Sequence, residues 1–185
     1  MAFERKSMGE LEALSEAQLG IIKPFQISIL LEDVRSMQNV GSVFRTSDAL
    51  GLHTLYLAGY TPRPPHRDIQ KTALGATETV PWVGLDDALV CLQQLKSDGV
   101  QIVAVEQTHN STPLHEFVPD LNKAYVLVFG NEVDGVSDAV LAMADAVIEI
   151  PQVGAKHSLN VSVSAGMVLW ELARYRFLSM NPKKE

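Results

Sequence analysis

The chain has 185 residues, of which 46% are hydrophobic, and this length and composition suit a single globular domain with a buried core. Its net charge of −7 argues against a protein that coats nucleic acid non-specifically, because such proteins are basic overall. One cysteine, five histidines without ligand spacing and the lack of an apolar run of roughly 20 residues argue against a disulfide, a metal site and a membrane span.

The chain begins with an expected helical extension over residues 1–24. Met8, Leu11 and Leu14 place apolar side chains on one face of an amphipathic helix, which Pro24 ends. This extension could pack on the domain or contact a partner. It has no apolar segment of the kind that secretory signals carry, so we expect a cytoplasmic protein.

Strands and helices alternate over the rest of the chain. Strands are expected over residues 25–31, 55–58, 79–83, 101–106, 124–129 and 146–150. Helices are expected over residues 39–50, 86–96 and 136–144 and from about 158 to 177, before a frayed tail over 178–185. This alternation predicts an α/β fold with a parallel sheet flanked by helices, in one domain over residues 1–185.

Three loops of this predicted sheet are candidates for a ligand site. Ligands of a parallel sheet bind beyond the carboxyl ends of its strands, so the loops after Glu106, Phe129 and Ile150 should gather there. None of them contains a GxGxxG sequence, so an ordinary dinucleotide site is unsupported.

Residues 61–71 form a local concentration of positive charge, which we call the basic segment. Arg63, Arg67 and Lys71 carry the charge, and Asp68 is the only acid among them. Such a run is often a solvated surface. On an acidic chain it is also a candidate site for RNA phosphates, and both interpretations stay open.

The final helix has a core-facing side and a side of small residues. Ser158 or Asn160 is expected to cap its first turn. The stripe expected to face the core consists of Val161, Ala165, Val168 and Leu172. Beside it, Ser162, Ala165 and Gly166 are small enough to let another backbone approach closely.

Three sequence motifs stand in order along the chain: NVGSVFR from Asn39 to Arg45, FGNEVDGVS from Phe129 to Ser137, and IPQVGAKHSLNVSVSAG from Ile150. They resemble the signature motifs of the SpoU (TrmH-like) RNA 2′-O-methyltransferases of the SPOUT class. The resemblance implies S-adenosylmethionine as cofactor and an RNA ribose 2′-hydroxyl as methyl acceptor, in tRNA first and rRNA second. It also implies a C-terminal deep trefoil knot and a homodimer.

The resemblance also implies which residues hold the cofactor. In the family, backbone groups of the knot loops bind adenine and ribose. At the matching positions stand Gly130, Ile150 and Leu159, with Val105 and Glu106 at a strand end as further candidates.

Arg45 matches the arginine that the family places at the reacting centre. It is often described there as a general base, but a guanidinium with a pKa above about 12 is poorly suited to accept a proton. We favour a different hypothesis, in which Arg45 clamps the phosphate beside the target ribose and stabilises the developing alkoxide.

Four further residues match the catalytic motifs, and each has a structural alternative. Asn39 could belong to the catalytic centre or cap a helix that starts near it. Glu132 could accept a hydrogen bond from Arg45 or Asn39 and hold its orientation, or it could simply be a solvated loop residue. Ser158 and Asn160 could contact cofactor or substrate, or cap the last helix.

Two rival functions remain. A catalytically idle RNA-binding module could keep the same fold, although the intact motif residues argue against it. An α/β enzyme acting on a small nucleotide is the other, and activity without the basic segment would favour it. The chain lacks the separate RNA-binding domain of some relatives, so RNA capture would rest on the first helix, the basic segment, Arg174 and Arg176.

Overall fold

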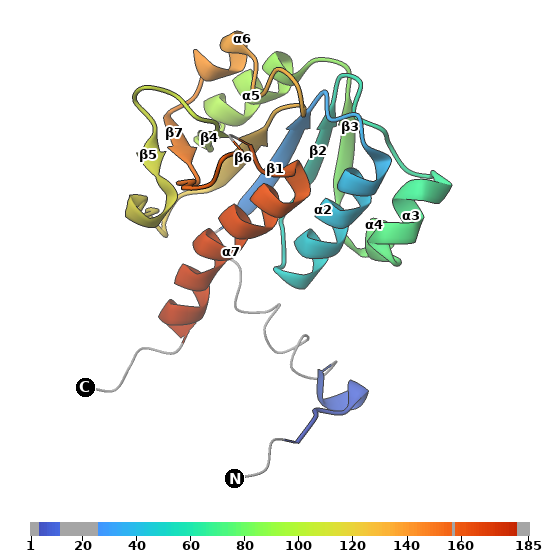
Figure 1. Ribbon diagram of the computed structural model, residues 1–185. Coiled ribbons are helices and arrows are strands. Elements are labelled where there is room, and N and C mark those ends of the chain that lie inside the picture. The colour runs from blue at the N-terminus through green and yellow to red at the C-terminus, as the bar shows by residue number, and fades with distance from the viewer. Residues whose placement is uncertain (1–3, 12–25, 157, 181–185) are drawn as a thin grey trace, which may run out of the picture.

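Seven parallel strands form the centre of the molecule (Figure 1). The computed structural model describes residues 4–11, 26–156 and 158–180. The strands are β1 (Ile27–Glu32), β2 (Leu55–Ala58), β3 (Trp82–Leu85), β4 (Gln101–Val105), β5 (Thr112–Pro113), β6 (Tyr125–Phe129) and β7 (Ala146–Glu149). Their order across the sheet is β3-β2-β1-β6-β4-β7-β5, and every ladder is parallel. The predicted α/β class is confirmed.

Helices cover both faces of the sheet and give the molecule three layers (Figure 1). One face carries α2 (Met37–Ala49), α3 (Arg67–Ala73), α4 (Ala76–Thr79), α7 (Val161–Met180) and the 3₁₀ turn η1 (Leu114–Glu116). The other face carries α5 (Ala88–Ser97) and α6 (Asp138–Leu141). On the first face α2 and α7 lie side by side.

The core forms on both sides of β1, as the continuous apolar run predicted. Ile29 and Leu31 pack under α2 and α7, while Leu30 packs toward α5 and α6, and all three are fully buried. The predicted stripe of α7 is also buried along its whole length. On its small-residue side, Gly166 faces the Thr46 side chain of α2 within the same chain.

Helix caps explain where two of the helices begin. The Ser36 hydroxyl accepts a hydrogen bond from the Asn39 backbone N–H at 3.2 Å, so α2 starts two residues earlier than expected. The interpretation of Asn39 as the cap is therefore wrong. At α7 the cap is Asn160 rather than Ser158, because its side-chain oxygen accepts from the Ser162 N–H at 2.9 Å.

Several expected boundaries differ from the structure. The strand expected over residues 79–83 is β3 at Trp82–Leu85, because the Val80 N–H bonds to the Ala76 carbonyl and closes the helical turn α4. Within the loop expected after Glu106 lies β5, whose two residues are too few to show a strand pattern. The third predicted helix is shorter than expected, and the last one runs to Met180.

Predictions for the two ends of the chain can be compared with the structure only in part. Of the N-terminal helix, residues 8–11 are helical, and residues 12–25 and the tail from 181 lie outside the described residues. Among the helices that are described, none has the length and apolar character needed to cross a bilayer. The trefoil knot and the single-domain organisation stay predictions.

Candidate active site

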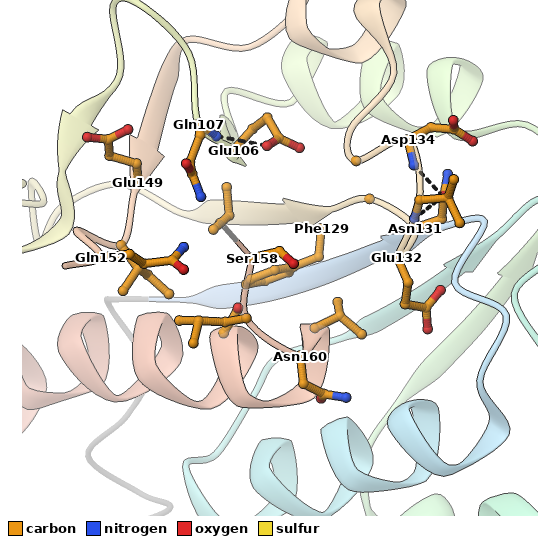
Figure 2. Close-up of a pocket in the computed structure, with 18 residues that line it drawn as sticks. Glu106, Gln107, Phe129, Asn131, Glu132, Asp134, Glu149, Gln152, Ser158 and Asn160 are labelled. Atoms are coloured by element: carbon orange, nitrogen blue, oxygen red, sulfur yellow. Dashed lines mark hydrogen bonds between the residues drawn. The ribbon is translucent and has the colours of Figure 1, made fainter. Parts of the chain in front are cut away.

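A cavity of about 570 Å³ opens beyond the carboxyl ends of β4, β6 and β7 (Figure 2). Its walls are the ends of these strands, the loops that follow them and the first turn of α7. The lining residues are Val105, Glu106, Gln107, Phe129, Gly130, Asn131, Glu132, Val133, Asp134, Gly135, Glu149, Ile150, Gln152, Ser158, Leu159, Asn160, Val161 and Ser164. The three loops expected to gather at this edge of the sheet therefore do so.

All five residues expected at the cofactor lie in this wall. They are Val105, Glu106, Gly130, Ile150 and Leu159. At Gly130 an added Cβ atom would collide with the backbone of Gly135, so a side chain there would push the two segments apart. The glycine thus lets the loop after β6 fold back closely on the end of its own strand.

Glu106 fixes this loop to the neighbouring strand. Its carboxylate accepts hydrogen bonds from the Gln107 N–H at 2.8 Å and from the Val136 N–H at 2.9 Å. The second bond joins the end of β4 to the loop after β6. Glu106 is therefore part of the wall's framework as well as a lining residue.

The loop over residues 131–135 is closed on itself. Asn131 and Gly135 exchange two backbone hydrogen bonds of 3.1 and 3.2 Å, and Gly135 has a φ of +71°. The Asn131 side-chain oxygen also accepts from the Val133 and Asp134 N–H groups. These bonds fix the backbone on both sides of Glu132.

A chain of side-chain hydrogen bonds joins the three sequence motifs. The Asn39 amide donates to Glu132 Oε1 at 2.9 Å, and the Asn39 side-chain oxygen accepts from the Asn160 amide at 3.0 Å. Figure 2 shows Glu132 and Asn160 on the side of the cavity that faces α2. Of the two partners suggested for Glu132 by the sequence, the structure gives it Asn39.

These contacts change the acidity of Glu132. Partial burial raises the pKa of its carboxyl group, but hydrogen bonds from its own backbone, from the Asn39 amide and from the loop before α2 outweigh burial. The pKa of Glu132 therefore lies below its ordinary value, and the carboxylate is ionised at neutral pH.

Arg45 stands apart from this chain. It is exposed on α2 and is not among the residues that line the cavity. Ser158 lines the cavity and is exposed in the loop before α7. The structure therefore brings together Asn39, Glu132, Ser158 and Asn160, and leaves the Arg45 guanidinium available at the surface.

The basic segment is less available than its sequence suggested. Arg63 donates to the Leu85 carbonyl at 2.6 Å and pairs with Asp86 at 3.0 Å. Lys71 pairs with Asp68 at 2.9 Å. Arg67 is exposed at the start of α3.

The two C-terminal arginines do not serve as free cations. Arg176 is only 5% exposed and donates to the Leu50 and Gly51 carbonyls at the end of α2. Burial lowers the pKa of Arg176 to about 10. Arg174 pairs with Glu171 on the same helix. The expectation that Arg176 contacts RNA is wrong, because its side chain holds α7 onto α2.

Six polar residues of the cavity wall were assigned no site role from the sequence: Gln107, Asn131, Asp134, Glu149, Gln152 and Ser164. Gln107 and Glu149 lie at strand ends, where the rule for parallel sheets could have found them. Among the described residues of the wall, the charged ones are all acidic: Glu106, Glu132, Asp134 and Glu149.

Comparisons with known proteins agree on one family. Residues 26–170 match the model of the SpoU rRNA Methylase family. A 23S rRNA (guanosine-2′-O-)-methyltransferase of Neisseria meningitidis serogroup B is 35% identical over 91% of this chain. The match covers 63% of that relative, so the chain spans less than two thirds of its length.

Two solved structures are similar over most of the chain. The TrmH/SpoU tRNA modifying enzyme of Aquifex aeolicus has a TM-score of 0.77 and 30% identity, over 92% of this chain and 86% of its own. An AdoMet-bound rRNA methyltransferase from Sinorhizobium meliloti has a TM-score of 0.76 and 28% identity, over 81% of this chain and 56% of its own.

Proposed function

This chain belongs to the SpoU rRNA methylase family, and on that premise we propose that it methylates a ribose 2′-hydroxyl of RNA with S-adenosylmethionine as methyl donor. One observation carries the proposal. The cavity beyond β4, β6 and β7 has Glu132, Ser158 and Asn160 in its wall, and a hydrogen-bond chain ties it to the helix that bears Arg45.

The cavity suits this cofactor in size and charge. About 570 Å³ falls within the range of small-molecule sites, and the acidic wall favours a ligand with positive charge. The cofactor supplies a methyl group on a positively charged sulfur. Backbone groups at Gly130, Ile150 and Leu159 would hold its adenosine part, and Glu106 and Val105 would form the adjoining wall.

Arg45 is the proposed clamp on the RNA backbone. Its planar guanidinium can bind a phosphate through two parallel hydrogen bonds, which fixes the neighbouring ribose for in-line attack by the 2′-oxygen. The same positive charge would stabilise the oxygen as its proton leaves to phosphate or water. Asn39, Asn160 and Glu132 act as positioning residues, since they hold α2 against the cavity.

We propose tRNA as the substrate, with rRNA as the alternative. The similarity to the A. aeolicus tRNA modifying enzyme supports tRNA, because it extends over 86% of that chain. In the basic segment, Arg67 is the foremost RNA contact, and Arg63 and Lys71 could join it by exchanging their present partners. Such RNA lies in the cytoplasm, where we propose that the protein acts.

We also propose that the protein is a homodimer. A second apolar stripe runs along the outer side of α7 and consists of Val163, Met167, Trp170 and Leu178, all exposed. The first three are spaced i, i+4 and i+7, which places them on one face of the helix. An exposed apolar stripe of this kind favours burial against an identical copy.

The test of the proposed function follows labelled methyl groups. Purified protein is incubated with labelled S-adenosylmethionine and either unmodified tRNA or rRNA, and label in the RNA is counted. We expect label in tRNA, its loss in Arg45→Ala, and at least a hundredfold slower transfer in Arg45→Lys, which keeps the charge but loses the planar fork.

Controls separate chemistry from binding. Lys123→Arg, an exposed residue just before β6 and so at the opposite end of that strand from the cavity, should transfer methyl groups at the wild-type rate. Methyl transfer by Arg45→Lys at nearly the wild-type rate would contradict the hypothesis that Arg45 clamps the phosphate. Failure of the wild-type protein to bind S-adenosylmethionine would instead favour an idle RNA-binding module.

A further inference from the structure

Polar side chains gather at two opposite ends of the cavity beyond β4, β6 and β7 (Figure 2). Glu132 and Asn160 lie at the end that faces α2, and Gln107, Glu149 and Gln152 lie at the other. We propose that Glu149 selects the adenine base of S-adenosylmethionine by accepting a hydrogen bond from its 6-amino group. The inference rests on the proposed function, since it concerns the proposed cofactor.

The strand order separates the two ends by the length of an adenosine group. Glu149 is the last residue of β7, which lies two strands away from β6, the strand that precedes Glu132. Neighbouring strands lie about 4.8 Å apart, so the two strand ends are roughly 10 Å apart. A cofactor with its sulfur beside Glu132, on the side of α2, can therefore extend its base to Glu149.

Exposure favours this orientation of the cofactor. Glu149, Ile150 and Gln152 are half-buried, whereas Glu132 and Asn160 are exposed. The faces of an adenine ring are apolar, so the base is stabilised by burial at the enclosed end beside Ile150. RNA must reach the methyl group, which places the sulfur at the open end.

The charges of the wall argue against the reverse orientation. With the methionine part at the enclosed end, its ammonium group would meet Glu149, but its own carboxylate would be buried near the same negative charge. Among the described residues of the wall, no side chain is cationic and could neutralise that carboxylate. Burying an unpaired carboxylate is costly, so the methionine part belongs at the open end, where water solvates both of its charges.

Glu149 is held in place at the edge of the sheet. Its backbone lies in β7 opposite Pro113 of β5, and the Ser111 hydroxyl donates to Glu149 Oε2 at 2.8 Å. The other oxygen, Oε1, accepts no hydrogen bond from the part of the chain that the structure describes. It is the acceptor that we assign to the amino group of adenine.

The chemistry of a carboxylate distinguishes adenine from its deaminated form, hypoxanthine. An ionised carboxylate only accepts hydrogen bonds. Adenine presents an amine donor at C6, whereas hypoxanthine presents a carbonyl oxygen there, which a carboxylate repels. Gln107 and Gln152, at the same end, carry the carboxamide group that can pair with the amine and an adjoining ring nitrogen of adenine.

Calorimetric titrations test the inference on the full-length protein without RNA. The two ligands are S-adenosylhomocysteine and S-inosylhomocysteine, which differ only in that hypoxanthine replaces adenine. We expect the wild-type protein to bind S-adenosylhomocysteine about tenfold more tightly, because a hydrogen bond to a charged group is lost in the other ligand. This comparison needs no variant.

Variants assign the preference to one side chain. In Glu149→Gln the two affinities should come within about twofold of each other, because the new amide can accept from the amine or donate to the carbonyl. Circular dichroism checks that this variant is folded. Glu116→Gln makes the same change at an exposed residue of η1, outside the cavity wall, and should keep the wild-type preference. A preference that Glu149→Gln retains in full overturns the inference, since other groups would then recognise the base.

The inference and the proposed function fail in different ways. If the wild-type protein binds both ligands equally well, the role of Glu149 is wrong and the proposed methyl transfer stands. If Glu149→Gln weakens binding of both ligands by the same factor, Glu149 binds the ammonium group of the methionine part, which also overturns the inference. If the wild-type protein binds neither ligand, the proposed cofactor is wrong and the inference falls with it.

Discussion

Glu132 is the acceptor at one end of the hydrogen-bond chain that joins the motifs, and its charge should matter for folding. Because its folded-state pKa lies below the ordinary 4.5, the ionised group stabilises the fold above that pH. The contribution is lost as the pH falls through the lowered pKa.

We predict that Glu132→Gln lowers the free energy of unfolding by about 1 kcal/mol at pH 7, a small value because the side chain is largely exposed. The difference from wild type should be full above pH 4.5 and should shrink as the pH falls through the lowered pKa of Glu132. Urea unfolding at pH 7, 5, 4 and 3 measures it. A difference of the same size at all four pH values would show that the charge is not its source.

Asn39 uses both ends of its amide, so an isosteric change should be costly. In Asn39→Asp the new carboxylate cannot donate to Glu132 and adds a second negative charge at hydrogen-bonding distance. We expect a loss of about 2 kcal/mol of stability and slower methyl transfer.

Adding Glu132→Gln to Asn39→Asp tests the pairing directly. The new amide can donate to the new carboxylate, which should recover about 1 kcal/mol in a double-mutant cycle. Asn110→Asp, in an exposed turn, is the control and should have no effect on stability. Simple additivity of the two changes would contradict a direct contact.

At the scale of elements, local sequence explains most of the fold and fails at short or context-dependent pieces. β1 could be predicted because it is a continuous apolar run, and the inner stripe of α7 because its apolar side chains recur at the helical period. β3 was misplaced because Thr79 and Val80 favour strands by type, whereas bonds to Asp48 and Ala76 hold them in and just after α4.

The close contact between β6 and its following loop gives an element-scale prediction. In Gly130→Ala the added Cβ atom clashes with the backbone of Gly135. A backbone segment cannot move aside as a flexible side chain could. We expect a loss of about 3 kcal/mol, at the upper end for overpacking, together with loss of cofactor binding. Urea midpoints and calorimetry measure the two effects.

Gly154→Ala is the matched control for this change. Its added Cβ atom meets nothing within 4 Å, so stability should stay within about 0.5 kcal/mol of wild type. If both alanine variants were equally stable, the close contact between Gly130 and Gly135 would not be the reason that position 130 requires glycine.

At the scale of the whole molecule, the site depends on contacts that no local pattern contains. The sequence motifs named Asn39, Glu132 and Asn160, but their hydrogen bonds link residues 93 and 121 positions apart. The ion pair between Arg63 and Asp86 could not be predicted from the sequence either, because it forms only where the ends of β2 and β3 lie side by side. The site residues and the order of their motifs could be predicted from the sequence, whereas their hydrogen-bond and ion-pair partners could be identified only from the folded structure.

The outer stripe of α7 gives the prediction at this scale. Trp170 is 54% exposed at its centre, and its ring lies 6.0 Å from that of Phe177. Large aromatic residues at the middle of an interface contribute most to its affinity. Trp170→Glu should therefore convert the proposed dimer, about twice the 20.2 kDa of the chain, into monomers.

Light scattering after size exclusion measures this change, and circular dichroism should show that the monomer is still folded, because Trp170 is exposed within one chain. Val90→Glu, on the opposite face at α5 and 64% exposed, introduces the same charge away from the stripe and should leave the mass unchanged. If RNA is bound across two subunits, Trp170→Glu should also lose methyl transfer while each chain still binds S-adenosylmethionine. A wild-type protein that is monomeric at micromolar concentration, or a Trp170→Glu variant that keeps its dimer mass, would place the subunit contact elsewhere or remove it.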